Sequence, residues 1–238
     1  MALTQSVIIC TKNRRSDLLR CLQSLSRQVK MPDEIIVVDS SDLPLSVDGA
    51  FTNEFDNLFI GKAHTKYLHT KPGLTYQRNK GIENAQGDII HFFDDDVQLE
   101  KSYLKVMQET FENNQSYVAG MGTITNLQPL SRCYRFFRAL FLLQRTYASG
   151  IFTASGMPTH PYGTRSFKNV EVLGGCCMAF RKTVLNVEKF DESFSGYAFM
   201  EDCDIARRIS FSHLIFYNPK AQLAHFESPV ARDRMYDS

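Results

Sequence analysis

The chain has no run of 18 or more apolar residues, and its formal net charge is only +1. A helix that spans a bilayer needs about 20 mostly apolar residues, so no transmembrane helix is expected. A nearly neutral chain produces no strong electric field, which argues against nucleic acid as a partner. The first residues become polar within a few positions, so no secretory signal is expected either. These absences favour a cytoplasmic globular protein.

The six cysteines lack the spacing of a zinc site. No Cys-x-x-Cys pair occurs, and Cys176 and Cys177 are adjacent. A zinc site or a disulfide framework is therefore not expected. The thiols are expected to be reduced and to act as small buried side chains.

Glycine is absent from the stretch CTKNRR, residues 10–15, which follows the first apolar run. Dinucleotide-dependent oxidoreductases and nucleotidyltransferases that make sugar nucleotides would need a glycine-rich phosphate loop there. The sequence argues against both classes. A non-catalytic module that binds sugar nucleotides or glycans stays open, because binding and catalysis would share most of the same residues.

Strand and helix patterns alternate through about residue 125 of the 238 residues, a length that suits one α/β domain. Short apolar runs predict strands at 6–10, 34–38 and 88–93, and a weaker one at 66–69. Helices are expected around Leu18, Leu22 and Leu25, with Ser16 as the N-cap, and at 74–85 and 102–112. This alternation predicts a Rossmann-like, mostly parallel sheet with helices on both faces.

The pattern changes after about residue 127. Residues 131–147 read as a helix with arginines on one side and apolar residues such as Phe137 and Leu140 on the other. Such a helix suggests contact with a membrane surface or a lipid-linked acceptor, and an ordinary helix packed on the sheet is the alternative. Residues 149–163 are expected to form a mobile loop. Strands are expected at 171–180, 214–217 and 222–225, with a helix beginning near residue 201.

Three polar clusters follow predicted strands directly: residues 11–14, Asp39, and the triplet Asp94, Asp95 and Asp96. Ligands of parallel sheets bind at the carboxyl ends of strands, so the clusters are expected to meet at one edge. Adjacent carboxylates repel each other by about 1 kcal/mol per pair in water. A cation would neutralise them, and oxygen ligands suit Mg²⁺ or Mn²⁺ bridged to phosphate. A solvated acidic turn is the alternative.

Five further residues are candidates for the site. Asp202 lies on the inward face of the helix that begins near residue 201, where it could accept a proton from a hydroxyl or compensate the helix dipole. His225 could complete a metal site or serve as a hydrogen-bonded structural residue. Arg78 could hold phosphate or form a surface salt bridge. Gly174 and Gly175 could let a ligand approach the backbone or mark a bulge.

Five ordered motifs resemble the inverting glycosyltransferases of family 2, which have the GT-A fold. SVIICTKNR resembles the first strand and nucleotide-binding turn of that family, and EIIVVDSSD its second strand and base-binding aspartate. PGLTYQRNKGIENAQGDIIHFFDDDV resembles its Arg-Asn-x-Gly helix and the DxD motif. VLGGCCMAFRKTVL and FDESFSGYAFMEDCDIARRI resemble the Gly-Gly strand on the acceptor side and the Glu-Asp motif. The similarity covers nearly the whole chain.

The resemblance implies a UDP-, GDP- or dTDP-sugar donor, Mn²⁺ or Mg²⁺, and transfer with inversion to a hydroxyl of a glycan or lipid-linked acceptor. The roles it implies are base binding for Asp39; the nucleotide pocket for Thr11, Arg14, Arg78, Asp94 and Asp95; the metal for Asp96 and His225; donor or acceptor sugar for Gly174 and Gly175; and catalysis for Asp202 as general base, oriented by Glu201.

The resemblance also implies one domain over residues 1–238, with a nucleotide-binding half at about 1–125 and a smaller acceptor-binding half at about 126–238. The chain departs from the family at Lys12, where relatives often carry an aromatic residue that stacks on the base. Relatives usually continue beyond a stretch like LAHFESP, so a further C-terminal segment is expected. A position at the cytoplasmic face of a membrane would fit a lipid-linked acceptor.

Overall fold

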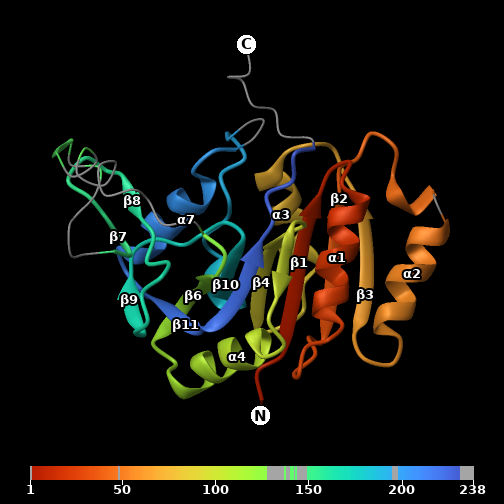
Figure 1. The fold of residues 1–238 in the computed structure, drawn as a ribbon, viewed down its shortest axis with the longest axis horizontal. Helices are drawn as coiled ribbons and strands as arrows, with labels where there is room; N and C mark the ends of the chain where they lie inside the picture. The colour runs from red at the N-terminus through yellow and green to blue at the C-terminus, as the bar shows by residue number, and fades with distance from the viewer. Residues whose placement is uncertain are drawn as a thin grey trace.

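The computed structural model describes residues 2–47, 49–127, 137, 140–141, 143, 149–194 and 198–230. Its centre is a twisted sheet with helices on both faces (Figure 1). Neighbouring strands follow the order β3-β2-β1-β4-β10-β6-β11-β5, and β9 pairs with the first part of β11. The α/β class predicted from the sequence is confirmed.

The first half of the sheet is parallel. β1 pairs with β2 on one side and with β4 on the other, and β2 pairs with β3. Residues 7–9 and 35–38 have no exposed surface, because helices cover both faces of these strands. Strands buried on both faces read as continuous apolar runs, which is why the sequence shows them clearly. The four strands are β1 (Gln5–Thr11), β2 (Glu34–Asp39), β3 (His64–His69) and β4 (Ile89–Asp94).

The helices of this half place its ligand-binding edge. α1 (Arg15–Leu25) and α2 (Gly49–Phe59) carry the chain outward from β1 to β3 and contact each other. α3 (Leu74–Asn84) returns the chain from β3 to β4 and packs behind β1 and β2, on the face opposite α1 (Figure 1). The order in which the chain adds strands to the sheet therefore reverses at β1, since β2 and β3 lie on one side of β1 and β4 lies on the other. The carboxyl ends at such a switch point are where an open α/β sheet binds its ligand.

The second half of the sheet is mixed. β10 lies between β4 and β6 and is antiparallel to both, whereas β6 and β11 are parallel. α4 packs on β6 and β11 in front of the sheet (Figure 1). The elements here are β5 (Val97–Leu99), α4 (Tyr103–Asn113), β6 (Tyr117–Ile124), β7 (Ile151–Phe152), β8 (Pro158–Thr159), β9 (Lys168–Val170), β10 (Cys177–Arg181), α6 (Lys182–Leu185), α7 (Glu201–Ser210) and β11 (Leu214–His225).

Several local expectations are wrong. Ser16 is not the N-cap, because α1 already begins at Arg15; the preceding turn is fixed by left-handed Asn13, whose N–H donates to the Ser41 hydroxyl. The strand expected at 171–180 forms only from Cys177, because residues 174–177 close a backbone turn. The strands expected at 214–217 and 222–225 are one strand, β11, with a register shift between them. α2, β5 and β6 were not expected.

Residues 131–163, in the second half of the chain, include the segment for which membrane contact is expected. The helix expected at 131–147 lies mostly outside the described residues; within it, Phe137, Leu140 and Phe141 are described, and each is exposed. The stretch 149–163 contains the short strands β7 and β8. Among the described residues, no helix combines the length and apolar character needed to cross a membrane.

Candidate active site

All the site residues expected from the sequence, except Asp39, line one cavity of about 660 Å³. It opens at the carboxyl ends of β1 and β4, beside the start of α7 and the Gly174–Gly175 turn. The chain folds this way because β10 is inserted next to β4, which brings the turn before β10 against the acidic end of β4. Residues far apart in the sequence therefore share one wall.

Asp94, Asp96 and His225 form a group of metal-ligand side chains. One ligand atom from each lies within 4.8 Å of the other two. Nε2 of His225 and Oδ1 of Asp96 are 2.9 Å apart, and Nε2 is buried and makes no hydrogen bond to any described residue. Neighbouring ligands of an octahedral ion with bonds of about 2.1 Å lie about 3 Å apart. The 2.9 Å between His225 Nε2 and Asp96 Oδ1 and the absence of a hydrogen bond between these two atoms both fit two ligands directed at one cation.

The backbone holds this group in place. Asp96 Oδ2 accepts a hydrogen bond of 2.9 Å from the Ser228 N–H, and the Phe226 N–H donates to the Asp96 carbonyl at 2.8 Å. The segment after β11 therefore lies across the end of β4. Two carboxylates and an imidazole are a set of hard oxygens with one nitrogen, and that set suits Mn²⁺ or Mg²⁺.

The protonation of the same residues is linked to cation binding. Burial lowers the pKa of His225, but the neighbouring Asp96 carboxylate outweighs it, so the pKa is raised. Burial acts to raise the pKa of Asp96, yet His225, the Ser228 N–H and Arg14 lower it on balance. Without a cation, each residue of the pair thus favours the charged form of the other. A metal would displace the proton from His225, so its affinity is expected to rise with pH.

Asp95 is turned away from the metal group. Its carboxylate accepts hydrogen bonds from the Thr11 hydroxyl at 2.7 Å and from Arg14 Nη1 at 3.2 Å. Burial raises the pKa of Asp95 to about 7, although Thr11 and Arg14 act to lower it. Arg14 also donates from Nε to the Val230 carbonyl at 2.8 Å. Asp95 therefore connects the end of β1 to the acidic turn.

Arg78 is buried rather than part of a surface salt bridge. Its guanidinium pairs with Glu201, donates to the Gly175 carbonyl at 3.2 Å and lies 3.7 Å from an Asp94 oxygen. Burial lowers the pKa of Arg78, but Glu201 and Asp94 outweigh it and raise the pKa. Burial raises the pKa values of both carboxylates, and Arg78 acts against this. Arg78 thus joins β4, the glycine turn and α7.

Asp202 lies in the first turn of α7, which follows a left-handed Met200. Its Oδ2 accepts a hydrogen bond of 2.7 Å from the Gly175 N–H. A Cβ at residue 175 would lie 3.3 Å from that oxygen, and one at Gly174 would lie 1.7 Å from the Tyr162 hydroxyl. The paired glycines therefore let side chains of the protein itself approach the backbone, with Asp202 oriented on the cavity wall.

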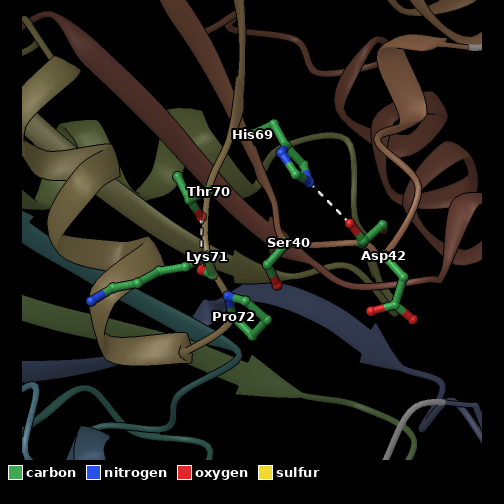
Figure 2. A pocket seen from close by; sticks show the side chains of 7 residues that line it. Ser40, Asp42, His69, Thr70, Lys71 and Pro72 are labelled. Atoms are coloured by element: carbon green, nitrogen blue, oxygen red, sulfur yellow. Dashed lines mark hydrogen bonds between the residues drawn. The ribbon is translucent and has the colours of Figure 1, made fainter.

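Asp39 lies apart from this cavity. It is fully buried, and its carboxylate accepts hydrogen bonds from the Ser41 N–H at 2.8 Å, the Leu45 N–H at 3.0 Å and the Tyr67 hydroxyl at 2.5 Å. Residues 40–42 and 69–72, at the ends of β2 and β3, line a second cavity of about 410 Å³ (Figure 2). Asp39 therefore fixes the turn that forms one side of this cavity.

The sequence does not predict several lining residues of the main cavity, among them His160, Tyr162, Cys203 and Gln77. His160 and Cys203 line it together with Asp202, and Tyr162 lies behind Gly174. Gln77, also unexpected, donates from Nε2 to the carbonyls of Thr11 and Val38 at 3.1 and 2.8 Å, which ties the ends of β1 and β2 together. No periodicity marks any of them in the sequence.

Solved structures with the same arrangement define the class of fold. The chain is similar to GalNAc-T7, crystallised with UDP, GalNAc and Mn²⁺, with a TM-score of 0.70 at 13% identity over 95% of this chain and 44% of that chain. For S. aureus TarS the TM-score is 0.62 at 18% identity, over 95% of this chain and 37% of that chain. At such identities the similarity shows the fold alone, which is that of GT-A glycosyltransferases.

The family follows from the sequence comparison. The model of "Glycosyl transferase family 2" matches residues 6–187, and the chain belongs to this family. The chain is 31% identical over 126 residues to glucosyl-dolichyl phosphate glucuronosyltransferase of Haloferax volcanii, covering 50% of this chain and 37% of that protein. It is 25% identical over 196 residues to GalNAc(5)-diNAcBac-PP-undecaprenol beta-1,3-glucosyltransferase of Campylobacter jejuni, covering 80% of this chain and 56% of that protein. The chain thus spans less than two thirds of either relative.

Proposed function

We propose that the chain transfers a sugar from a nucleoside-diphosphate-sugar to an acceptor hydroxyl, with a divalent cation and with inversion at the anomeric carbon. One observation carries the proposal. The Asp94–Asp96–His225 group shares a cavity with the Asp202 carboxylate, which the Gly175 N–H holds in place. A cation site for a diphosphate and an oriented base are the two parts that a direct displacement needs.

In this mechanism Asp202 accepts the proton of the acceptor hydroxyl as its oxygen attacks the anomeric carbon. The new glycosidic bond forms while the bond from that carbon to the diphosphate oxygen breaks, and the nucleoside diphosphate leaves with the electron pair. A cation held by Asp96 and His225, with Asp94 beside them, would neutralise charge on the diphosphate. Arg78 holds Glu201 and Asp94 across the site and adds positive charge near the leaving group.

The donor would lie along the edge of the first three strands. We place its base and ribose in the cavity lined by residues 40–42 and 69–72 (Figure 2). Asp39 supports that cavity through the Ser41 and Leu45 N–H groups, whereas Thr11, Arg14 and Asp95 line the main cavity. Two of the similar solved structures contain UDP, which makes a UDP-sugar the first donor to test, before GDP- and dTDP-sugars.

The acceptor we propose is a glycan on a lipid carrier at the cytoplasmic face of a membrane. The names of two relatives contain dolichyl phosphate and PP-undecaprenol. Phe137, Leu140 and Phe141 are between 52 and 65% exposed, and exposed apolar side chains can enter a membrane interface.

The substitution Asp202→Asn tests the mechanism, because it keeps the shape of the side chain and removes the base. Release of nucleoside diphosphate from each UDP-, GDP- and dTDP-sugar is measured with Mn²⁺, with and without glycan acceptors. We expect the variant to lose at least about 100-fold in transfer rate, as for loss of a general base, and to bind nucleotide nearly as well as the unsubstituted chain. The anomeric configuration of the product, determined by NMR, is expected to be inverted.

Transfer by Asp202→Asn at the rate of the unsubstituted chain would reject Asp202 as the base. A product with retained configuration would reject the direct displacement. If the unsubstituted chain bound nucleotide but neither transferred nor hydrolysed any donor, it would instead be a sugar-nucleotide-binding module.

A further inference from the structure

A second group of metal-ligand side chains lies in the main cavity. One ligand atom from each of His160, Asp202 and Cys203 lies within 4.8 Å of the other two. His160 follows β8, whereas Asp202 and Cys203 belong to the first turn of α7, so only the folded chain brings them together. The group differs from Asp94–Asp96–His225 in containing sulfur.

A hydrogen bond and a ring contact fix the orientation of the His160 ring. Its Nε2–H donates to the Leu173 carbonyl at 2.9 Å, so in the neutral ring the lone pair is on Nδ1. The ring also stacks on Tyr162, with centroids 5.3 Å apart and an interplanar angle of 3°. Histidine ligands in metal sites usually donate their other ring N–H to a carbonyl or carboxylate, which sets the tautomer and the ring orientation.

The two α7 residues supply the remaining ligand atoms. Asp202 accepts one backbone N–H at each oxygen, from Gly175 and from Cys203, which leaves a lone pair on each oxygen. Cys203 is only 3% exposed but lines the cavity. A thiol gives up its proton when a metal binds its sulfur. A nitrogen, an oxygen and a sulfur suit Zn²⁺, whereas Mg²⁺ and Mn²⁺ prefer oxygen.

We propose that His160, Asp202 and Cys203 form a zinc site with an open fourth position, and that zinc bound there inhibits sugar transfer. Binding forms a Zn–S bond as the Cys203 thiol releases its proton to solvent, without any change of oxidation state. The metal occupies the Asp202 carboxylate, which can then no longer accept the proton of an acceptor. The inhibition rests on the function proposed above, but zinc binding does not.

Cobalt(II) absorbance tests the site without any assay of activity, because a Co²⁺–thiolate bond gives a charge-transfer band. The measurement uses protein with Asp96→Ala, so that the Asp94–Asp96–His225 group is impaired. We expect the band to appear on addition of Co²⁺ and to disappear when Zn²⁺ is added. Adding Cys203→Ser should abolish the band, and adding His160→Asn should weaken Co²⁺ binding at least about tenfold.

Cys10→Ser is the matched control, because Cys10 lines the same cavity outside the group and its loss should leave the band unchanged. If the Asp96→Ala protein that keeps Cys203 and His160 showed no band, the site would be overturned. A band that survives Cys203→Ser or disappears with Cys10→Ser would also overturn it. Thermal unfolding shows whether the Cys203→Ser protein folds. If it does not fold, the His160→Asn protein is used instead. Equal Co²⁺ affinity with and without His160→Asn would overturn the proposal.

The inhibition is tested by adding Zn²⁺ to a transfer reaction that is saturated with Mn²⁺. Each protein is compared with its own rate without zinc. We expect His160→Asn to need at least about tenfold more zinc for half-inhibition than the unsubstituted chain. Equal zinc sensitivity would overturn the inhibitory role. If the unsubstituted chain showed no transfer at all, the proposed function would fail, while the Co²⁺ band would still decide whether the site exists.

Discussion

His91 lies in the middle of β4 and has no exposed surface. Its Nε2 contacts the Gln5 side-chain oxygen at 3.0 Å, and its Nδ1 has no hydrogen-bond partner among the described residues. Burial lowers the pKa of His91 from 6.5 to about 3. The folded chain therefore keeps this ring neutral, whereas the unfolded chain would bind a proton below its ordinary pKa. The contribution of the neutral His91 ring to the free energy of unfolding is complete above pH 6.5 and is lost as the pH falls towards 3.

His91→Gln is expected to remove this dependence, because glutamine can still donate to Gln5 and does not titrate. The free energy of unfolding is measured with urea at several values between pH 6.5 and pH 4. The unsubstituted chain should lose stability more steeply than the variant, with a difference that approaches about 1.4 kcal/mol per pH unit. His64→Gln is the control, because His64 is exposed. Equal slopes for His91→Gln and the unsubstituted chain would contradict the buried neutral ring.

At the scale of elements, the turn that leads into β10 packs against Tyr162. A Cβ added at Gly174 would lie 1.7 Å from the Tyr162 hydroxyl and 3.0 Å from Cζ of that ring. Gly174→Ala is therefore expected to cost about 1 to 3 kcal/mol of stability through overpacking. In a Tyr162→Phe background the hydroxyl is gone, and the cost should fall by at least about 1 kcal/mol.

Urea unfolding of the four proteins of this double-mutant cycle measures the coupling. Gly49→Ala is the control, because a Cβ at Gly49 meets nothing within 4 Å. Its effect should stay within about 0.5 kcal/mol. The same loss for Gly174→Ala in both backgrounds would show that Tyr162 is not what fills this space.

How much of the fold the sequence predicts depends on whether the signal is local. β1, β2 and β4 are buried on both faces, so their apolar runs identify them. α2 also has a local signal, since Phe51, Phe55 and Phe59 repeat every fourth residue and are buried. The sequence does not identify β6, because Gly120 weakens the strand pattern. The ring of Phe216, from β11, fills the space that a side chain at residue 120 would take. That ring comes from almost 100 residues further along the chain.

The same distinction separates the site residues. Asp94 ends a buried strand and Asp96 lies two residues further on, so their place at the sheet edge could be predicted. Helix periodicity predicts Asp202 on the inward face of its helix, but in α7 Asp202 is half-buried and Glu201 is the buried carboxylate. His160 and Cys203 could not be found from sequence, because their proximity arises only when β8 and α7 pack around the glycine turn. Cysteine spacing alone does not detect a group of side chains assembled in this way.

At the scale of the whole molecule, exposed apolar residues predict membrane association. Flotation of the protein with liposomes that contain anionic lipid is expected to recover it in the lipid fraction, because Phe137, Leu140 and Phe141 can enter the interface. Replacing all three with serine should return it to the aqueous fraction. Replacing exposed Val187, Leu43 and Ile60 with serine is the control. No flotation of the unsubstituted protein would remove membrane contact from the account.

The two halves of the sheet meet where β1 and β4 end, and the central claim is that a cation held there binds the diphosphate of the donor. Calorimetric titration of UDP, GDP and dTDP, with Mn²⁺ and with a chelator, tests this claim most directly. We predict that at least one nucleotide binds only with Mn²⁺, and that Asp96→Ala weakens this binding at least about tenfold. Tight binding in the chelator, or equal Mn²⁺-dependent binding by Asp96→Ala, would contradict the account.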